Sequence, residues 1–459
     1  MDININNSFT PDTDQQAAID ACTTLEKRLV AVSGPAGSGK TTIIRKVYEF
    51  FQDRGISVVL CAPTGKAARR IKEATGIDAI TIHKLLEYNR PGERDAKTGE
   101  PLDVTMPKRD RKNPLHYRVV IADEYAMVNH TLHNNLLAAL PAGGSIRMFG
   151  DIHQLPPIEE YKITRTDGSV EDTPFQKMIA RPDSIVLKHV YRQAEGSNIL
   201  LSADKIRKGH MPPVNDDLGD FYLRVTDRPV EMLKLHIRQA MEKDINYGKI
   251  ENQVITPTRK TWIGTHSLNL VLRTILNPNP EQTLELPRHS WDKNRVTIGI
   301  GDKVVCTQNT YDLRDYFERY AEWTNEMRPV PDSYIPCPPT KQMLNGETGI
   351  VTQIFPDGGI EIDFGDRIVE LPHVYEEYSS KQDRTFPTKP ACDVDLAFAL
   401  TTHKCQGSEF QHVTYVLNKS AFFVLSRANF YTAVTRAKKS VHVLTDQKAL
   451  RPAVLTNRR

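Results

Sequence analysis

The sequence predicts an α/β protein with two parallel-sheet regions and a small antiparallel insertion. Apolar runs rich in Val, Ile and Leu alternate with amphipathic stretches over residues 14–155, as expected for parallel strands that helices cover on both faces. A second α/β region starts near residue 185, pauses near 295 and resumes near 393. In that pause, short β-rich runs are split by Gly and Asp turns, which indicates a small antiparallel barrel.

The first region alternates between buried strands and helices. Strands are predicted at residues 29–34, 57–63, 117–124 and 145–151, and helices at 41–52 and 65–75. Sheets of this kind bind ligands at the C-terminal ends of their strands. Residues 88–116 interrupt the pattern because they are rich in proline and charge, and this composition predicts an insertion between two strands.

The second region is predicted to contain a strand at 252–258 and a helix within 262–276. The β-rich runs occupy 296–309 and 347–372, and a loop rich in proline and charge separates them at 312–342. Four parts are therefore predicted. The first α/β domain comprises 1–87 and 117–184, its insertion 88–116, the second α/β domain 185–295 and 391–459, and the β-rich insertion 296–390.

The composition limits the class of protein but does not identify a partner. The 459 residues are too many for one ordinary core. A content of 39% hydrophobic and 25% charged residues is ordinary for a globular protein. The net charge of +3 neither predicts nor excludes nucleic acid, because a protein that slides along a strand needs only a local basic groove.

Cysteine usage and the N-terminal sequence predict a cytoplasmic protein. The six cysteines include no CxxC pair, and we interpret them as reduced thiols. The N-terminus lacks a basic stretch followed by an apolar one, so no signal peptide is expected. No run of about 18 apolar residues occurs, so no membrane span is expected.

A phosphate-binding loop follows the first predicted strand. The segment GPAGSGKTT fits the pattern GxxxxGK(S/T) and leads directly into a predicted helix, which is the context this motif requires. Backbone N–H groups of such a loop bind phosphate oxygens, and the helix N-terminus adds partial positive charge. Residues predicted to hold the nucleotide are Gly34, Pro35, Ala36, Gly37, Ser38, Gly39, Lys40, Thr41 and Thr42.

The segment IADE supplies the second half of a nucleotide site. Lys40 is expected to reach the β and γ phosphates, and Thr41 to offer a hydroxyl to Mg²⁺. Asp123 is expected to hold Mg²⁺, and Glu124 to orient and deprotonate the attacking water. Together the two motifs predict an ATP- and Mg²⁺-dependent hydrolase, but P-loop kinases share the first motif.

Seven further segments narrow this class. They are TDQQAAID (13–20), APTGKAARR (62–70), TIHKLL (81–86), GDIHQLPPI (150–158), FALTTHKCQGSEF (398–410) and, with the YRQ that stands at 191–193, NFYTAVTRAKKSVHVL (429–444). In this order they resemble the superfamily 1B helicases of the RecD and Dda group. The resemblance covers both α/β regions and implies two RecA-like motor domains with a small barrel, similar to the Src-homology-3 fold, inserted in the second.

The resemblance implies further nucleotide contacts. Gln15 would read adenine, because an amide both donates and accepts, although a polar residue at a helix start is the alternative. Gln154 would sense the γ-phosphate. Arg192 and Arg436 would bring positive charge to that phosphate from the second domain. Gly407 and Glu409 would lie near the nucleotide.

The resemblance also implies contacts with a nucleic-acid strand. The residues concerned are Pro63, Thr64, Thr81, His83, Thr402 and His403. A structural histidine is an equally open interpretation of His83. Cys405 stands where the family usually has serine, and no neighbouring base marks it as catalytic.

The activity implied is that of a 5′ to 3′ motor on single-stranded and forked DNA. Insertion 88–116 would carry a strand-separating pin, and NGETG (345–349) resembles a turn of the family's barrel domain. We expect a monomer that acts in replication, recombination or repair. Proteins of replication or recombination are its expected partners, and the sequence does not identify them. Alternatives are a DNA-stimulated translocase without unwinding, a subunit of a recombination complex, an RNA helicase and, least favoured, a metabolic kinase.

Overall fold

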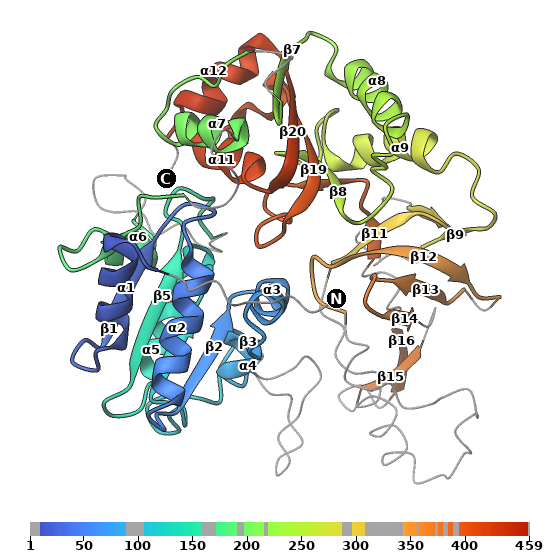
Figure 1. Cartoon of the computed structure of the whole chain (residues 1–459). Helices are drawn as coiled ribbons and strands as arrows, with labels where there is room; N and C mark the ends of the chain where they lie inside the picture. Colours follow the sequence, from blue (N-terminus) through green and yellow to red (C-terminus); the bar gives the residue numbers. More distant parts are fainter. Residues whose placement is uncertain are drawn as a thin grey trace. The chain divides into compact units, whose positions relative to one another are not determined.

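The computed structural model places most of the chain in two compact units (Figure 1). The first unit comprises residues 1–197 with 458–459, and the second comprises residues 198–457. Residues described are 10–88, 105–157, 171–190, 197–214, 219–286, 296–307, 343–356, 358–371, 375–379, 384–388 and 394–457. Most of the predicted insertion 88–116, the loop 312–342 and Arg192 lie outside them.

The first unit is built on a six-stranded sheet with the order β3-β2-β4-β5-β1-β6. Every neighbouring pair of strands is parallel, which confirms the predicted parallel sheet. Its strands are β1 (Leu29–Ser33), β2 (Val58–Ala62), β3 (Ala79–Thr81), β4 (Val119–Ala122), β5 (Ser145–Gly150) and β6 (Ile185–Val186).

Helices pack on both faces of this sheet. Alternate residues of a strand face opposite sides, so Val30 and Val32 join one core cluster while Ala31 joins the other. The first cluster includes side chains of α1, α2 and α3, and the second includes side chains of α4, α5 and α6. The helices are α1 (Thr13–Thr23), α2 (Lys40–Gln52), α3 (Gly65–Thr75), α4 (Ile82–Leu85), η1 (Tyr125–Met127), α5 (His130–Ala138) and α6 (Pro174–Ile179).

Strand β6 changes where the first unit ends. The sequence placed the start of the second α/β region near residue 185, yet Ile185–Val186 pairs in parallel with the end of β1. The compact unit therefore extends to residue 197. Two residues are too short to show the periodicity of a strand, so only the pairing with β1 identifies this edge.

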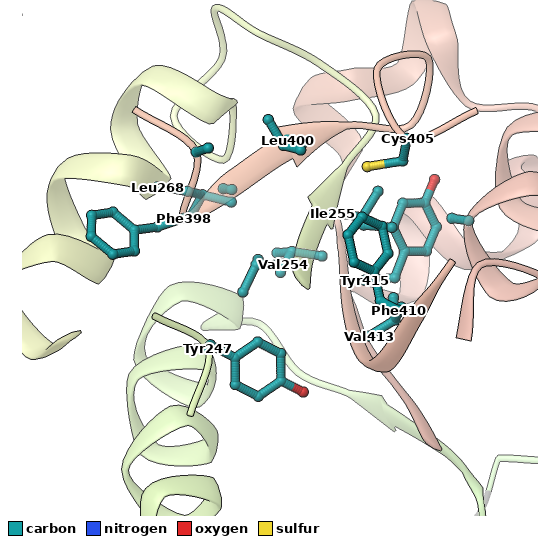
Figure 2. Close-up of a cluster of buried hydrophobic side chains, with 14 of the residues drawn as sticks. Tyr247, Val254, Ile255, Leu268, Phe398, Leu400, Cys405, Phe410, Val413 and Tyr415 are labelled. Carbon is teal, nitrogen blue, oxygen red and sulfur yellow. The ribbon is translucent and has the colours of Figure 1, made fainter. Parts of the chain in front are cut away.

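The second unit contains a five-stranded parallel sheet with the order β18-β8-β19-β20-β7. Its strands are β7 (Phe221–Val225), β8 (Asn252–Thr256), β18 (Ala399–Thr401), β19 (Phe410–Leu417) and β20 (Ala437–Thr445). The helices are α7 (Asn198–Arg207), α8 (Pro229–Met241), α9 (Thr265–Leu276), η4 (Lys419–Val424), α11 (Arg427–Val434) and α12 (Gln447–Leu455). Figure 2 shows part of its core, including Val254, Ile255 and Tyr415, all nearly inaccessible to solvent.

An antiparallel sheet of five strands, order β14-β13-β12-β11-β17, belongs to the same unit. Its strands are β11 (Lys303–Cys306), β12 (Thr348–Ile354), β13 (Ile360–Asp363), β14 (Ile368–Leu371) and β17 (Val394–Leu396). Two antiparallel pairs accompany it, β9 (Thr283–Glu285) with β10 (Thr297–Gly299), and β15 (Tyr375–Ser379) with β16 (Arg384–Thr388). Strand β17 lies beyond the predicted limit at residue 390, because its partner β11 comes from the start of the β-rich block.

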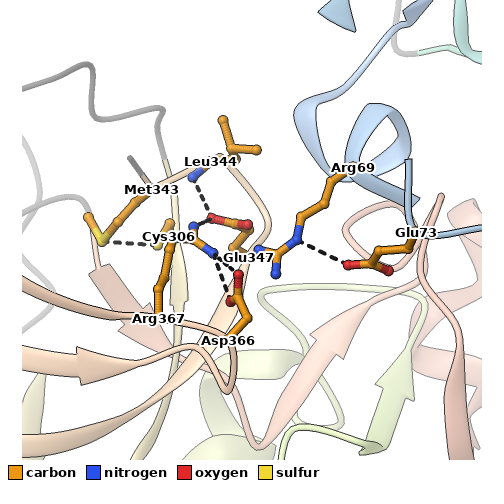
Figure 3. Close-up of polar contacts among 8 residues, drawn as sticks. All are labelled: Arg69, Glu73, Cys306, Met343, Leu344, Glu347, Asp366 and Arg367. Atoms are coloured by element: carbon orange, nitrogen blue, oxygen red, sulfur yellow. Dashed lines mark hydrogen bonds and ion pairs between the residues drawn. The ribbon is translucent and has the colours of Figure 1, made fainter. Parts of the chain in front are cut away.

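Two buried polar contacts anchor this antiparallel sheet. Lys303 is fully buried and donates from Nζ to the carbonyls of Lys249 and Asn252, at 3.0 and 2.6 Å, next to the start of β8. Arg367 forms an ion pair with Glu347 in the NGETG turn (Figure 3). A buried charge requires such partners, so these contacts fix the turn and join the two sheets of the unit.

Candidate nucleotide site and nucleic-acid surface

The sequence motifs of the first unit converge on one edge of its sheet. The phosphate loop follows β1, Asp123 and Glu124 follow β4, and the segment from Asp151 to Gln154 follows β5. Since β4, β5 and β1 are consecutive and parallel, their carboxyl ends lie side by side, about 5 Å apart from strand to strand. The residues predicted to bind nucleotide are therefore brought together.

Lys40 lies at the first position of α2, and its ammonium group folds over the phosphate loop. Its Nζ donates to the carbonyls of Gly34 and Pro35 at 2.8 and 3.0 Å. Gly39 precedes the helix with φ of +84°, and a Cβ there would lie 2.5 Å from Nε2 of Gln15. The pattern's second glycine is thus required for both its backbone angle and the close approach of Gln15.

Gln15 holds the phosphate loop from outside. It stands in the first turn of α1, where Asp12 and Gln15 cap each other. The Gln15 amide nitrogen also donates to the carbonyl of Ser38 at 3.1 Å, and the side chain is only 3% exposed. The amide therefore contacts the loop that would bind phosphate, and adenine recognition by this residue stays a prediction.

Asp123 and Glu124 form an acidic pair in a constrained backbone. Burial, and next the charge of Glu124, raise the pKa of Asp123 to about 6, while Lys40 and Arg70 act in the opposite direction. The backbone N–H of Glu124 donates to the Asp123 carboxylate at 2.8 Å. Glu124 itself has φ of +51° and ψ of +36°, a left-handed conformation that costs about 1 kcal/mol or more in a non-glycine residue and is concentrated at functional sites.

Two buried polar atoms beside the loop lack a hydrogen-bond partner among the described residues. They are Oγ of Ser38 and Oε1 of Gln154, and both side chains are at most 6% exposed. The segment that carries Gln154 is tied to the loop, because the backbone N–H of Gly34 donates to the carbonyl of Gly150 at 3.0 Å. Buried polar groups normally bind something, so these atoms indicate a polar ligand at this edge.

The predicted nucleic-acid residues of the first unit begin short helices. Thr64 caps α3 by accepting from the backbone N–H of Ala67, and Thr81 caps α4 by accepting from that of Lys84. Pro63 precedes Thr64 and is partly exposed. The ring of His83 lies 4.9 Å from that of Tyr88. These contacts give the residues structural roles, and contact with a strand stays a prediction for each.

In the second unit, the segment Thr401–Glu409 runs from the end of β18 to the start of β19. Thr402 was expected to contact nucleic acid, but its side chain is fully buried and its hydroxyl donates to Oδ1 of Asn429 at 2.7 Å. In this placement Thr402 anchors the segment to α11, and contact of its side chain with a strand stays a prediction. His403 is partly exposed, and burial lowers its pKa.

Arg436 is packed beneath the same segment. Its guanidinium is 2% exposed and donates to the carbonyls of Thr432 and Ser408, at 3.0 and 3.1 Å. Gly407 is buried in the turn above it with φ of +71°, and Glu409 pairs with Lys438 at 3.1 Å. The structure therefore links the two motifs predicted to lie near nucleotide, at 398–410 and 429–444.

Comparison with known proteins agrees with this geometry. Residues 10–220 match the model of the AAA domain, and residues 396–444 match the model of the UvrD-like helicase C-terminal domain. The ATP-dependent RecD2 DNA helicase of Deinococcus radiodurans is 29% identical over 90% of this chain. The RecD subunit of the RecBCD enzyme of Mycolicibacterium smegmatis is 27% identical over 96% of it. The chain is therefore similar to the RecD-like helicases of superfamily 1B.

The chain spans 46% of the length of the Deinococcus relative and 72% of that of the Mycolicibacterium relative. Among solved structures, two Pif1 helicases are similar in fold. One structure concerns unwinding of forked DNA and has a TM-score of 0.54 at 18% identity, with 97% of this chain and 94% of that chain covered. The other is a Bacteroides Pif1 with ADP-AlF3 and single-stranded DNA, at 0.53 and 17%, with 97% and 95% covered.

Sequence reasoning missed two features of this site. Arg70 on α3 lies close enough to Asp123 to lower its pKa, although β2 and β4 are far apart along the chain. The pairing of β2 with β4 brings the two residues together, and the sequence alone does not reveal this pairing. Ser38 was assigned to the loop, but its orphaned hydroxyl follows only from the packing around it. The four described cysteines are free and buried. No described helix has the length and hydropathy to cross a bilayer.

Proposed function

We propose that this chain is an ATP-dependent DNA helicase that moves 5′ to 3′ along single-stranded DNA and couples ATP hydrolysis to unwinding. The convergence of the phosphate loop, the Asp123–Glu124 pair and the Gln154 segment at one sheet edge carries this proposal. The family resemblance adds the class of track. A relative is named an ATP-dependent DNA helicase, and a structural neighbour holds single-stranded DNA.

The residues at this edge suit a triphosphate with Mg²⁺. Lys40 would exchange its bonds to the Gly34 and Pro35 carbonyls for phosphate oxygens, which it meets as a strong point charge. Mg²⁺ would be held by Thr41 and Asp123, and it would neutralise charge that develops on the transferring phosphoryl group. Burial disfavours the charged form of the Asp123 carboxylate. A cation bound beside it would offset this penalty.

Glu124 is the proposed base. Because its backbone is left-handed, its side chain does not follow the direction that a continuing strand would give it. The hydrogen bond from the Glu124 N–H to the Asp123 carboxylate stabilises this turn. Glu124 would orient the attacking water and accept its proton. Gln154, whose Oε1 lacks a partner among the described residues, would hydrogen-bond that water or the γ-phosphate. Arg192 and Arg436 are proposed phosphate contacts; Arg436 would have to exchange its bonds to Thr432 and Ser408.

Several finer assignments belong to the same proposal. Insertion 88–116 would carry the pin that separates strands, and the antiparallel block 296–390 would form the family's barrel. Two similar Pif1 structures, one concerning forked DNA and one holding single-stranded DNA, support action at single-stranded and forked DNA. A monomer is the proposed state of the chain. Assembly with replication or recombination proteins is an open possibility within this proposal, because a relative is named as a RecBCD subunit.

The first test is ATP hydrolysis with and without oligo-dT. We expect strong stimulation by DNA in the unchanged chain, and loss of turnover in Lys40→Ala and Glu124→Gln. Glu124→Gln should still bind ATP, because the amide keeps the shape and loses only the base. Turnover that ignores DNA, or that survives Lys40→Ala, would overturn the assignment.

The second test is strand displacement on duplexes with a single-stranded tail at either the 5′ or the 3′ end. The proposal expects unwinding only from the 5′ tail, and Lys40→Ala serves as the inactive control. DNA-stimulated hydrolysis without displacement from either tail would instead identify a translocase that does not unwind. Displacement from the 3′ tail alone would refute the proposed direction.

A further inference from the structure

An exposed tryptophan stands at the carboxyl end of the second unit's sheet. The loop 257–264 connects β8 to α9, and within it Trp262 is 48% exposed while its neighbour Ile263 is fully buried. A single exposed apolar side chain is ordinary in itself, so the groups around Trp262 decide what it can bind. No sequence motif singled out this loop, so its aromatic residue is unassigned by the proposed function.

Hydrogen bonds and a close backbone approach fix the conformation of this loop, so the side chain of Trp262 is held at the surface. The hydroxyl of Thr256 donates to the carbonyl of Ile263 at 2.8 Å, and the backbone N–H of Gly264 donates to the carbonyl of Thr261 at 2.7 Å. A Cβ at Gly264 would lie 2.6 Å from the carbonyl carbon of Arg259, so the loop closes too tightly for any other residue. Preorganised aromatic side chains lose little entropy when they bind.

Positive charge flanks the tryptophan. Arg259 and Lys260 precede it in the same loop and are exposed. Arg259 contacts His266 at 2.9 Å through Nε, and its other end lies 3.5 Å from Asp395. The cations therefore outnumber the single acidic neighbour that these contacts bring to the loop.

The loop lies beside the segment predicted to meet nucleic acid. Thr256, the last residue of β8, is the register partner of Thr401, the last residue of β18. His403 and Lys404 follow directly on the neighbouring strand's carboxyl side, and Arg259 lies near enough to Lys404 to lower its pKa, after burial as the larger cause. Because parallel strands end at a common edge, the two loops form one surface.

We propose that Trp262 stacks on a base of single-stranded nucleic acid while Lys260 and Arg259 contact the flanking phosphates. An aromatic face next to cations is the chemistry that binds single strands without reading their sequence. A protein partner is less favoured, because an apolar interface core is depleted of charge, whereas Trp262 is bordered by cations along the chain. This inference rests on the proposed function and adds a contact outside the segments quoted in the sequence analysis.

The test measures affinity of the full chain for fluorescently labelled oligo-dT by anisotropy, without nucleotide. Trp262→Ala should weaken binding roughly 5- to 150-fold, the range expected for loss of one stacked base. Trp262→Phe should stay within about threefold of the unchanged chain because it keeps a π face. Trp262→Leu should resemble the alanine variant, and Leu270→Ala, which truncates an exposed side chain on α9, should bind normally.

Two further readouts separate stacking from charge. Lys260→Gln should reduce the slope of log affinity against log salt by about 0.7, as for one phosphate contact on a single strand, whereas Trp262→Ala should leave that slope unchanged. Three tryptophans occur in the chain, and DNA should quench the emission of the unchanged chain more than that of Trp262→Phe.

The outcomes distinguish this inference from the proposed function. If the unchanged chain fails to bind oligo-dT, both are overturned. If it binds and Trp262→Ala binds equally well, or if Trp262→Leu restores affinity, only the stacking inference is overturned. Equal melting temperatures of the variants exclude a folding defect as the cause of any loss. If the smaller variants unfold, the quenching comparison decides: equal quenching of the unchanged chain and Trp262→Phe by DNA overturns the stacking inference.

Discussion

Replacing His442 with phenylalanine should protect the second unit against acid. The His442 ring is stacked on Tyr222, with centroids 4.3 Å apart and planes 5° apart, and lies 4.1 Å from the ring of His236 on α8. Burial lowers the pKa of His442 to about 3 and that of His236 to about 4. Nearby Arg224 and Lys243 act in the same direction on both, as does His412 on His442.

The sign of the effect follows from proton binding in the two states. An unfolded histidine binds its proton below pH 6.5, whereas these rings stay neutral in the fold until about pH 4 and 3. Stability is therefore fully present above pH 6.5 and decreases as the pH falls toward 4. At pH 5 each buried neutral ring lowers the free energy of unfolding by about 2 kcal/mol, since each unit of pKa difference between the unfolded and folded states is worth about 1.4 kcal/mol. The pair therefore costs about 4 kcal/mol.

The assay compares melting temperatures at pH 8 and pH 5. His442→Phe keeps a ring on Tyr222 but removes one titrating group, so its loss of stability on acidification should be about 2 kcal/mol smaller. For a unit of this size that is about 4–8 °C of melting temperature at pH 5. His210→Gln removes an exposed histidine and should follow the unchanged chain. Identical pH dependence of His442→Phe and the unchanged chain would refute the reasoning.

Two other substitutions test the two units. Asp123→Asn should abolish hydrolysis. In the chain without nucleotide and Mg²⁺ it should raise the free energy of unfolding at pH 7 by about 3 kcal/mol, because the buried carboxylate, with a pKa near 6, is charged at that pH. The accompanying gain in melting temperature should be mostly gone at pH 4. Arg367→Ala should cost about 3 kcal/mol in urea unfolding, because the buried Glu347 carboxylate loses its ion pair and keeps the weaker bond from the Leu344 N–H. Adding Glu347→Gln should recover part of the loss. Arg69→Ala, which breaks the exposed pair with Glu73 in Figure 3, should cost under about 1 kcal/mol; equal costs for the two arginines would contradict this account.

The parts of the fold that the sequence predicted have local causes. The run LVAV is apolar at every position and is followed by Ser33 and Gly34, so it predicts a strand buried on both faces, and β1 covers Leu29–Ser33. The phosphate loop was predicted for the same reason, because its glycines and Lys40 stand at fixed spacing between a strand and a helix. Short-range patterns of this kind survive folding because the backbone itself enforces them.

Other assignments depended on contacts between distant segments. Thr402 belongs to a motif that suggests exposure, but Asn429 on α11 draws its hydroxyl into the core. Strand β6 exists because Ile185–Val186 meets the end of β1. Arg70 reaches the field of Asp123 only because β2 lies next to β4. In each case the partner is remote in sequence, and nothing near the residue announces it.

The amino-acid sequence by itself determined the resemblance to a helicase family, the parallel-sheet class and the chemistry of the phosphate loop, because these follow from residue types at short, fixed spacings. Only the tertiary structure decided which side chains are free to act. In the folded chain Thr402 is buried, Arg436 donates a hydrogen bond to the Ser408 carbonyl, and Trp262 lies at the surface. Exposure is a property of the packed whole, since each side chain's access to solvent depends on every element that happens to lie against it.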